Sequence, residues 1–229
     1  MAEERLLLAV VCRNPDIGTV KTRLIPALGE EGARALYRAF LQDLGTRFAG
    51  QPYDLLWAHT PEGGPPPAAL VRGSRLAQEG PDLGHRLLHI FRQALAGGYG
   101  RVVVTSSDVP HLSQEVVEAA FTALASQDVV LAPSEDGGYH LVGMREPHDI
   151  FTMVPMSTPT VFTDTRKVLI DRALRHEVLA GDFDVDLPED LPRLARRLAE
   201  DPALHESHTA RELRVRLAVR CSIDSGREA

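Results

Sequence analysis

The stretch "RVVVTSSDVPHL", residues 101 to 112, decides the fold class of this chain. Its first part, "RVVVTSS" (101 to 107), does not alternate between apolar and polar residues, which is typical of a strand buried on both faces. Four further runs share this character, and they are "RLLLAVVC" (5 to 12), "DLLWAH" (54 to 59), "DVVLAP" (128 to 133) and "YHLVGM" (139 to 144). Strands of this kind occur in sheets that helices cover on both sides.

Helical patterns lie between these runs. Residues 31 to 48 and 84 to 96 each place apolar side chains on one stripe at helical spacing, and residues 113 to 126 begin with a capping serine. Further helices are expected after residue 187 and over residues 208 to 220. The alternation of strands and helices predicts an α/β protein, a three-layer α/β/α sandwich with a mostly parallel mixed sheet.

The length of 229 residues suits one core. We expect one transferase-sized domain over residues 1–200, followed by a C-terminal helix and a frayed tail over residues 201–229. The Pro- and Gly-rich stretch "TPEGGPPPAALVRGS" (60 to 74) is expected to be a surface loop inside that domain, because the strand and helix pattern resumes after it.

Composition excludes several classes of protein. A net charge of -7 argues against a protein that coats nucleic acid. The first apolar run is short and follows two acids, so neither a signal peptide nor a membrane partner is expected, and the predicted location is cytoplasmic. Cys12 and Cys221 have no metal-type spacing, and the histidines form no zinc motif. The oligomeric state is left open between monomer and homodimer.

Ligands of open α/β sheets bind beyond the carboxyl ends of the strands, and "CRNPDIGTVKTRL" (12 to 24) follows the first strand directly. Gly18 shapes a turn there, while Arg13, Lys21 and Arg23 can place positive charge around phosphate oxygens. The segment does not match a Walker A loop or the dinucleotide-binding glycine pattern. A solvated basic loop with no ligand is the alternative.

Asp108 stands at the end of the deciding strand, where a carboxylate is costly unless it is paired, hydrated or bound to a cation. Mg²⁺ typically takes one or two protein carboxylates together with phosphate oxygens and water. Pro110 follows and cannot extend the hydrogen-bond ladder of the strand. The alternative, that Asp108 caps the helix beginning near Ser113, places it about five residues too early.

Two further segments add acids to the same edge. In "APSEDGGYHLVGM" (132 to 144), Gly137 and Gly138 allow a ligand to approach the backbone beside Asp136, and a hairpin turn at this place is compatible with that role. In "GDFDVDLPEDL" (181 to 191), Asp184 and Asp186 project to the same face of an extended segment, within reach of one cation. An acidic loop that leads into a helix is the alternative for the second segment.

The motifs "PDIGTVKTRL", "SSDVP", "SEDGGYHLVG" and "DFDVDLPEDL" together resemble the GT-A-type transferases of the nucleotide-diphospho-sugar transferase fold. More closely, they resemble a bacterial glycosyltransferase-like family related to the guanylyltransferase CofC, over residues 5 to 195. Two departures stand out. Ser106 and Ser107 occupy positions where that family more often has glycine, and Met156 stands where a tryptophan before serine is common.

The resemblance implies a mixed-sheet domain with a divalent metal, Mg²⁺ or Mn²⁺, at Asp108, completed by Asp184 and Asp186. It implies a nucleotide whose phosphates meet Lys21 and Arg23, and a small-molecule acceptor. The residues expected to bind the nucleotide are Arg13, Gly18, Lys21, Arg23 and Ser107, those facing the acceptor are Asp136, Gly137 and Gly138, and those counted as catalytic are Lys21, Arg23, Asp108 and Asp136.

Three functions remain open at this point. The first is nucleotidyl transfer from a nucleoside triphosphate (NTP) to a small phosphorylated acceptor, with release of pyrophosphate, which the basic first loop favours. The second is glycosyl transfer from a nucleotide-sugar, with Asp136 near the sugar. The third is a non-catalytic nucleotide-binding module, which is ranked last because all three expected metal carboxylates are present.

Overall fold

The computed structural model describes residues 4–225, with side chains through residue 216. Its strands are β1 (Leu6–Cys12), β2 (Asp54–His59), β3 (Ser74–Ala77), β4 (Arg101–Ser106), β5 (Val129–Pro133), β6 (Tyr139–Met144) and β7 (His176–Val178). In this part of the chain they form one sheet of seven strands in the order β3-β2-β1-β4-β6-β5-β7. Strand β6 runs antiparallel to β4 and β5, and the other neighbours are parallel. The predicted mostly parallel mixed sheet is confirmed.

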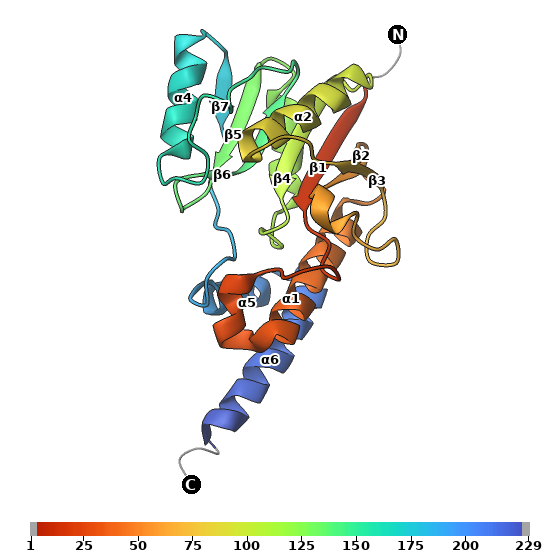
Figure 1. Ribbon diagram of the computed structural model, residues 1–229, viewed down its shortest axis with the longest axis vertical. Helices are drawn as coiled ribbons and strands as arrows, with labels where there is room; N and C mark the ends of the chain where they lie inside the picture. Colours follow the sequence, from red (N-terminus) through yellow and green to blue (C-terminus); the bar gives the residue numbers. More distant parts are fainter. Residues whose placement is uncertain (1–3, 226–229) are drawn as a thin grey trace.

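Helices cover both faces of the sheet (Figure 1). They are α1 (Ile25–Phe48), α2 (Leu83–Ala96), α3 (Gln114–Ala123), α4 (Val161–Asp171), α5 (Asp190–Glu200) and α6 (His208–Ser225). Leu8 and Val10 of β1 join a core with α1, α3, α5 and α6, whereas Leu7 and Ala9 face the core formed with α2 and α4. This alternation, with both faces buried, explains the unbroken apolar runs. None of the helices within residues 4–225 is both long enough and apolar enough to cross a lipid bilayer.

The first helix shows how local sequence sets an element boundary. Gly29 has φ 70° and ψ 166°, so the backbone is not helical at this residue although residues on both sides are. Glycine adopts such angles without the penalty of a side chain. The continuous helix therefore starts after Gly29, close to the start predicted at residue 31.

The expected surface loop at residues 60–74 is only partly at the surface. Leu70 and Val71 are buried in the core, and the indole nitrogen of Trp57 donates a 2.7 Å hydrogen bond to the carbonyl of Arg72. Val71 packs near Gly45 of α1, at ordinary van der Waals distance from where a Cβ atom would lie. The Pro- and Gly-rich composition predicted a loop correctly, but it did not reveal that Leu70 and Val71 join the core.

Helix α6 packs along α1, and Figure 1 shows the two helices side by side below the sheet. Asp43 of α1 is buried, and its carboxylate accepts hydrogen bonds of 2.8 Å from the backbone nitrogens of His208 and Thr209. These nitrogens are among the unpaired donors at the start of α6. The tail expected to fray from Cys221 is helical to Ser225, and residues 226–229 lie outside the described range.

The order of the strands creates a switch point between β1 and β4. The chain leaves β1 toward β2 and β3 on one side and returns to β4 on the other side. Loops that leave two neighbouring parallel strands in opposite directions open a crevice at their carboxyl ends, which is where open α/β sheets bind ligands. Arg13 follows β1 and Asp108 follows β4. The fold therefore brings the basic loop and the acid at the end of β4 to one place.

Replacing Asp43 by asparagine should lower the free energy of unfolding by about 1 to 2 kcal/mol, because the anion at the start of α6 becomes neutral and one of its two acceptor oxygens is lost. Urea denaturation measures the change. Asp171→Asn, at an exposed position at the end of α4, serves as the control and should stay within about 0.5 kcal/mol. Equal effects of the two substitutions would contradict the capping role.

Candidate active site

A cleft lies at the carboxyl edge of the sheet, over the switch point. It has two halves, of about 610 Å³ and about 520 Å³, and both are lined by Arg13, Arg23, Asp108, Ser157 and Asp186. The first half extends over the ends of β1, β2 and β3, and the second extends over the amino end of β6. Because the two halves share these residues, they form one continuous site and meet at the acid pair Asp108 and Asp186.

The end of β4 is braced from within the protein. The backbone nitrogen of Asp108 donates a 3.1 Å hydrogen bond to the hydroxyl of Ser106, and the hydroxyls of Ser107 and Tyr37 lie 2.9 Å apart in a hydrogen bond. The Tyr37 oxygen also accepts a 2.9 Å bond from the backbone nitrogen of Arg13. The hydroxyls of Ser106 and Ser107 thus hold the strand end in shape, and Ser107 is buried. Asp108 does not cap α3, because Ser113 does so.

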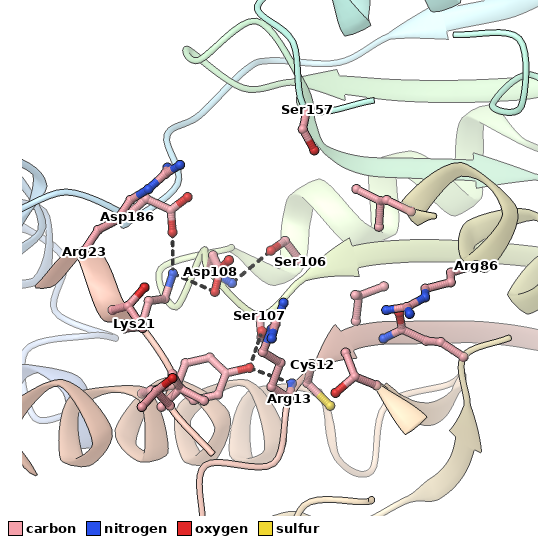
Figure 2. A pocket seen from close by; sticks show the side chains of 18 of the residues that line it. Cys12, Arg13, Lys21, Arg23, Arg86, Ser106, Ser107, Asp108, Ser157 and Asp186 are labelled. Atoms are coloured by element: carbon pink, nitrogen blue, oxygen red, sulfur yellow. Dashed lines mark hydrogen bonds and ion pairs between the residues drawn. The ribbon is translucent and has the colours of Figure 1, made fainter. Parts of the chain in front are cut away.

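Lys21 lies between two of the expected metal ligands. Its Nζ is 2.7 Å from Oδ1 of Asp108, 2.7 Å from Oδ1 of Asp186 and 2.8 Å from the carbonyl of Val185, as Figure 2 shows for the two carboxylates. The Lys21 side chain is only 6% exposed, against 32% and 43% for Asp108 and Asp186. Burial alone would lower the pKa of the ammonium, but the two carboxylates outweigh it and raise the pKa above its ordinary value.

Asp184 takes no part in the contact with Lys21. Its neighbours Phe183 and Val185 are buried, which confirms the period of two predicted for the segment. The Asp184 carboxylate accepts a short hydrogen bond from the hydroxyl of Ser134 and lines the second half of the cleft. Burial raises the pKa of the Asp184 carboxyl to about 7; the Ser134 bond opposes this rise, and the nearby carboxylates of Asp108, Asp136 and Asp186 add to it.

The glycine pair forms the expected hairpin turn between β5 and β6. The side chain of Asp136 accepts a 2.9 Å hydrogen bond from the backbone nitrogen of Gly138, and both residues line the second half of the cleft. Gly137 has φ 90°, and a Cβ atom at this position would overlap the carbonyl oxygen of Pro159. Its glycine is therefore required by the turn and by the close approach of the loop before α4.

The other sequence-predicted residues divide between cleft and surface. Arg13 and Arg23 have exposed side chains and line both halves. Gly18 has φ 72° and shapes the exposed loop as predicted, but it is not among the residues that line either half. Asp182, on the same extended segment as Asp184, lines neither half and pairs with His111 at 3.1 Å.

Sequence reasoning missed several residues that line the cleft, among them Gln78, Arg86 and Ser157. Gln78 follows β3 and donates a 2.7 Å hydrogen bond to the carbonyl of Ala58, and Arg86 projects into the first half from α2. Ser157 lines both halves with a left-handed backbone, φ 65°, which is uncommon for a residue with a side chain. In the sequence, Arg86 was marked only by the helical stripe over residues 84 to 96, and Ser157 only as the serine that follows Met156. Nothing near Gln78 marked it as a cleft residue.

The buried thiol and imidazole at the site are neutral. Burial raises the pKa of the Cys12 thiol to about 12, which agrees with a packing role. Burial lowers the pKa of the His140 imidazole to about 4, so this ring carries no charge near pH 7. The charge of the cleft therefore comes from its arginines, from Lys21 and from its aspartates.

That charge is unequal between the halves. The first half is lined by four basic side chains, Arg13, Lys21, Arg23 and Arg86, against three acids, Asp82, Asp108 and Asp186. The second half adds two acids, Asp136 and Asp184, and no further lysine or arginine. A polyanionic ligand is favoured in the first half, and a ligand with hydroxyl groups is favoured in the second.

Among the described side chains, no group of three His, Cys, Asp or Glu residues is close enough together to hold a metal ion. The pair Asp108 and Asp186 is nevertheless suited to Mg²⁺, since the two Oδ1 atoms lie at most twice 2.7 Å apart and both carboxylates remain partly exposed to the cleft. The expected three-carboxylate site, with Asp184 as a member, stays a prediction.

Comparison with known proteins gives relatives along most of the chain. Residues 68–158 match the model of a family described as "uncharacterized protein conserved in bacteria (DUF2064)". A phosphoenolpyruvate guanylyltransferase of Sphaerobacter thermophilus is 27% identical over 203 residues, which cover 84% of this chain and 95% of the relative.

Solved structures show similarity at two levels. A protein of Desulfovibrio desulfuricans G20, assigned as a nucleotide-diphospho-sugar transferase, is 32% identical with a TM-score of 0.87, over 94% of this chain and 96% of its own. The CMP:2-keto-3-deoxy-manno-octonic acid synthetase in complex with CTP is 14% identical with a TM-score of 0.51, over 86% of this chain and 99% of its own. At that identity the second similarity concerns the fold alone.

Replacing Gly137 by alanine should lower the free energy of unfolding by about 3 kcal/mol or more. The alanine would have to adopt a positive φ, and its Cβ atom would overlap the carbonyl oxygen of Pro159. Gly50→Ala provides the matched control, because Gly50 also has a positive φ, 75°, but its Cβ would meet open space. The control should lose only about 1 to 2 kcal/mol. Denaturation curves that show the same loss for both variants would contradict the close approach at Gly137.

Proposed function

This chain belongs to the nucleotide-diphospho-sugar transferase family and is a nucleotide-dependent transferase; from that premise we propose that it transfers a nucleotidyl group from an NTP to a small phosphorylated acceptor. The observation that supports this proposal best is the basic first half of the cleft, which ends at the paired Asp108 and Asp186. A triphosphate is the polyanion that such a half would accept.

In the proposed reaction, an oxygen of the acceptor's phosphate forms a bond to the α-phosphorus of the NTP, and the bond from that phosphorus to the departing pyrophosphate breaks. Arg13, Arg23 and Arg86 would bind phosphate oxygens and orient the chain of phosphates. Asp108 and Asp186 would hold Mg²⁺ or Mn²⁺, which when bound neutralises charge on the phosphates. The chain's own contribution is thus positioning and charge stabilisation, the main sources of rate in phosphoryl transfer.

The second half would hold the acceptor. Its phosphate would lie near Arg13 and Arg23, which border both halves, and its remaining groups would extend toward Asp136 and Asp184. Carboxylates accept hydrogen bonds from hydroxyl groups, so they can fix an acceptor that carries them. Gly138 of the turn beside Asp136 also lines this half, whereas Gly137 does not and packs against Pro159 instead.

Glycosyl transfer is a second candidate, and a specific observation favours it. The second half adds Asp136 and Asp184 without any further lysine or arginine, an environment that suits the hydroxyl groups of a sugar better than a second phosphate. In that reaction the diphosphate of a nucleotide-sugar would occupy the first half, and an acceptor hydroxyl would attack the anomeric carbon. Asp136 would then be the candidate base.

The product decides between these reactions. We expect the protein, incubated with Mg²⁺, the four NTPs in turn and a panel of small phosphorylated acceptors, to release pyrophosphate, and the same acceptors without phosphate should be inactive. Release of nucleoside diphosphate from UDP- or GDP-sugars would establish glycosyl transfer instead. Thermal stabilisation by nucleotides without turnover in either assay would identify a binding module.

Asp108→Asn should reduce kcat by about 100-fold or more, because it removes a charge placed at the middle of the cleft while keeping the shape of the side chain. Near-ultraviolet circular dichroism should show a folded variant. Asp54→Asn is the control, since Asp54 forms an exposed 3.0 Å ion pair with Arg5 at the opposite edge of the sheet, and it should keep its activity. Wild-type turnover in Asp108→Asn would remove Asp108 from the proposed reaction.

A further inference from the structure

Lys21 is held in place by its backbone as well as by its charge. It has φ 49° and ψ 45°, in the left-handed region, at the residue that precedes the short helix Thr22–Leu24. The Lys21 carbonyl accepts a 2.9 Å hydrogen bond from the nitrogen of Leu24, and Nζ lies 5.9 Å from the centre of the Phe40 ring. A residue with a side chain keeps this backbone only where its surroundings stabilise it.

The ammonium occupies the position that a divalent cation would need. A cation that bound Oδ1 of both Asp108 and Asp186 would lie between two oxygens that are at most twice 2.7 Å apart, which is where Nζ now lies. The ligand bonds of Mg²⁺ are about 2.1 Å long, so an ion on the same two oxygens would lie within about 4 Å of the ammonium, where the two positive charges repel each other strongly. Binding of a divalent cation to this pair therefore requires Lys21 to move.

Moving Lys21 is unfavourable unless another anion receives it. The Lys21 side chain is 6% exposed, and its partners are the carboxylates of Asp108 and Asp186 and the carbonyl of Val185. If the metal took both carboxylates, only the Val185 carbonyl of these three would stay bound to the ammonium. A buried ammonium without a counter-charge is costly, and it would also repel the arriving divalent cation. A triphosphate in the first half of the cleft would supply acceptor oxygens for the ammonium and further ligands for the metal.

We propose that Lys21 acts as the resident cation of the Asp108 and Asp186 pair, so that a divalent metal enters the pair only together with the phosphates of the nucleotide. This inference rests on the proposed function for the identity of the nucleotide, but not for the competition between Lys21 and the metal. Metal and nucleotide then increase each other's affinity by the same factor. Lys21 is a positioning residue in the free protein and meets the phosphates only in the complex.

Binding of Mn²⁺ to the free protein, followed by electron paramagnetic resonance or calorimetry, tests the competition directly. Lys21→Met removes the charge and keeps a side chain of similar length, and it should bind Mn²⁺ at least about tenfold more tightly than the wild type without any nucleotide. Lys167→Met, at the chain's other lysine on an exposed part of α4, should leave Mn²⁺ affinity unchanged. Adding Asp108→Asn to Lys21→Met should abolish the gain.

Equal Mn²⁺ affinity in the wild type and in Lys21→Met would overturn the proposal, as would the absence of Mn²⁺ binding in both. If Lys21→Met fails to fold, Lys21→Gln, which is also neutral but can donate a hydrogen bond, takes its place with the same expected gain. If neither variant folds, the wild type decides: a non-hydrolysable triphosphate should tighten Mn²⁺ binding to the protein at least about tenfold beyond what the affinity of the triphosphate alone for Mn²⁺ accounts for, and an unchanged affinity overturns the proposal. A triphosphate that does not bind counts against the proposed function and leaves the variant comparison intact.

Discussion

The contact of the Lys21 ammonium with Asp108 and Asp186 joins three segments that are far apart in the chain. Lys21 belongs to the loop after β1, Asp108 to the end of β4, and Asp186 to the extended segment before α5, with Nζ 2.7 Å from each carboxylate. Removing Lys21 would leave two partly buried carboxylates without their counter-charge, and removing the carboxylates would leave the buried ammonium without its own. The free-energy cost of such an unpaired charge is larger than the net stability that the intact contact contributes. The geometry of the cleft therefore depends on this contact, since both halves meet at these carboxylates.

The same contact reduces the negative charge at the middle of the cleft. Two carboxylates so close together would repel each other and would weaken the binding of any phosphate. With the ammonium between them, the first half keeps a surplus of basic side chains, and the acids of the second half, Asp136 and Asp184, lie beyond the pair. The protein can thus present carboxylates and bind a polyanion in one continuous site.

Much of the fold could be predicted from the sequence because burial on both faces of the sheet leaves unbroken apolar runs, as at Val102 to Val104 in β4. The prediction missed β3 and β7, which are strands of four and three residues at the two edges of the sheet and are too short to show a pattern. It also missed α4, whose apolar residues Val161, Val168 and Leu169 are interrupted by charges and threonines. Edge elements of this kind gain stability from their neighbours more than from their own sequence.

The site could be predicted in part because the carboxyl ends of parallel strands meet at one edge, which placed Arg13, Asp108 and the acidic segment together without knowledge of the contacts. The pairing of Lys21 could not be predicted in this way. It depends on a left-handed backbone at a residue with a side chain, and no local pattern indicates that conformation. Gln78 and Arg86 were missed for a related reason, because the crossover from β2 through β3 to α2 brings them to the cleft, and their own neighbours in the sequence carry no sign of it.

The choice of basic residue follows from the shape of the acceptors at each place. The chain has 25 basic residues and uses lysine at only two of them, Lys21 and Lys167. The arginines of the cleft, such as Arg23 and Arg86, present planar forks that match the oxygens of a phosphate. A compact ammonium can contact two carboxylate oxygens at once, as Lys21 Nζ does at 2.7 Å from each. A guanidinium is planar and larger, so it would need more room between them. A compact single charge is also the side-chain group closest in form to a metal ion, so lysine at position 21 suits a place where the protein's own cation and an external one alternate.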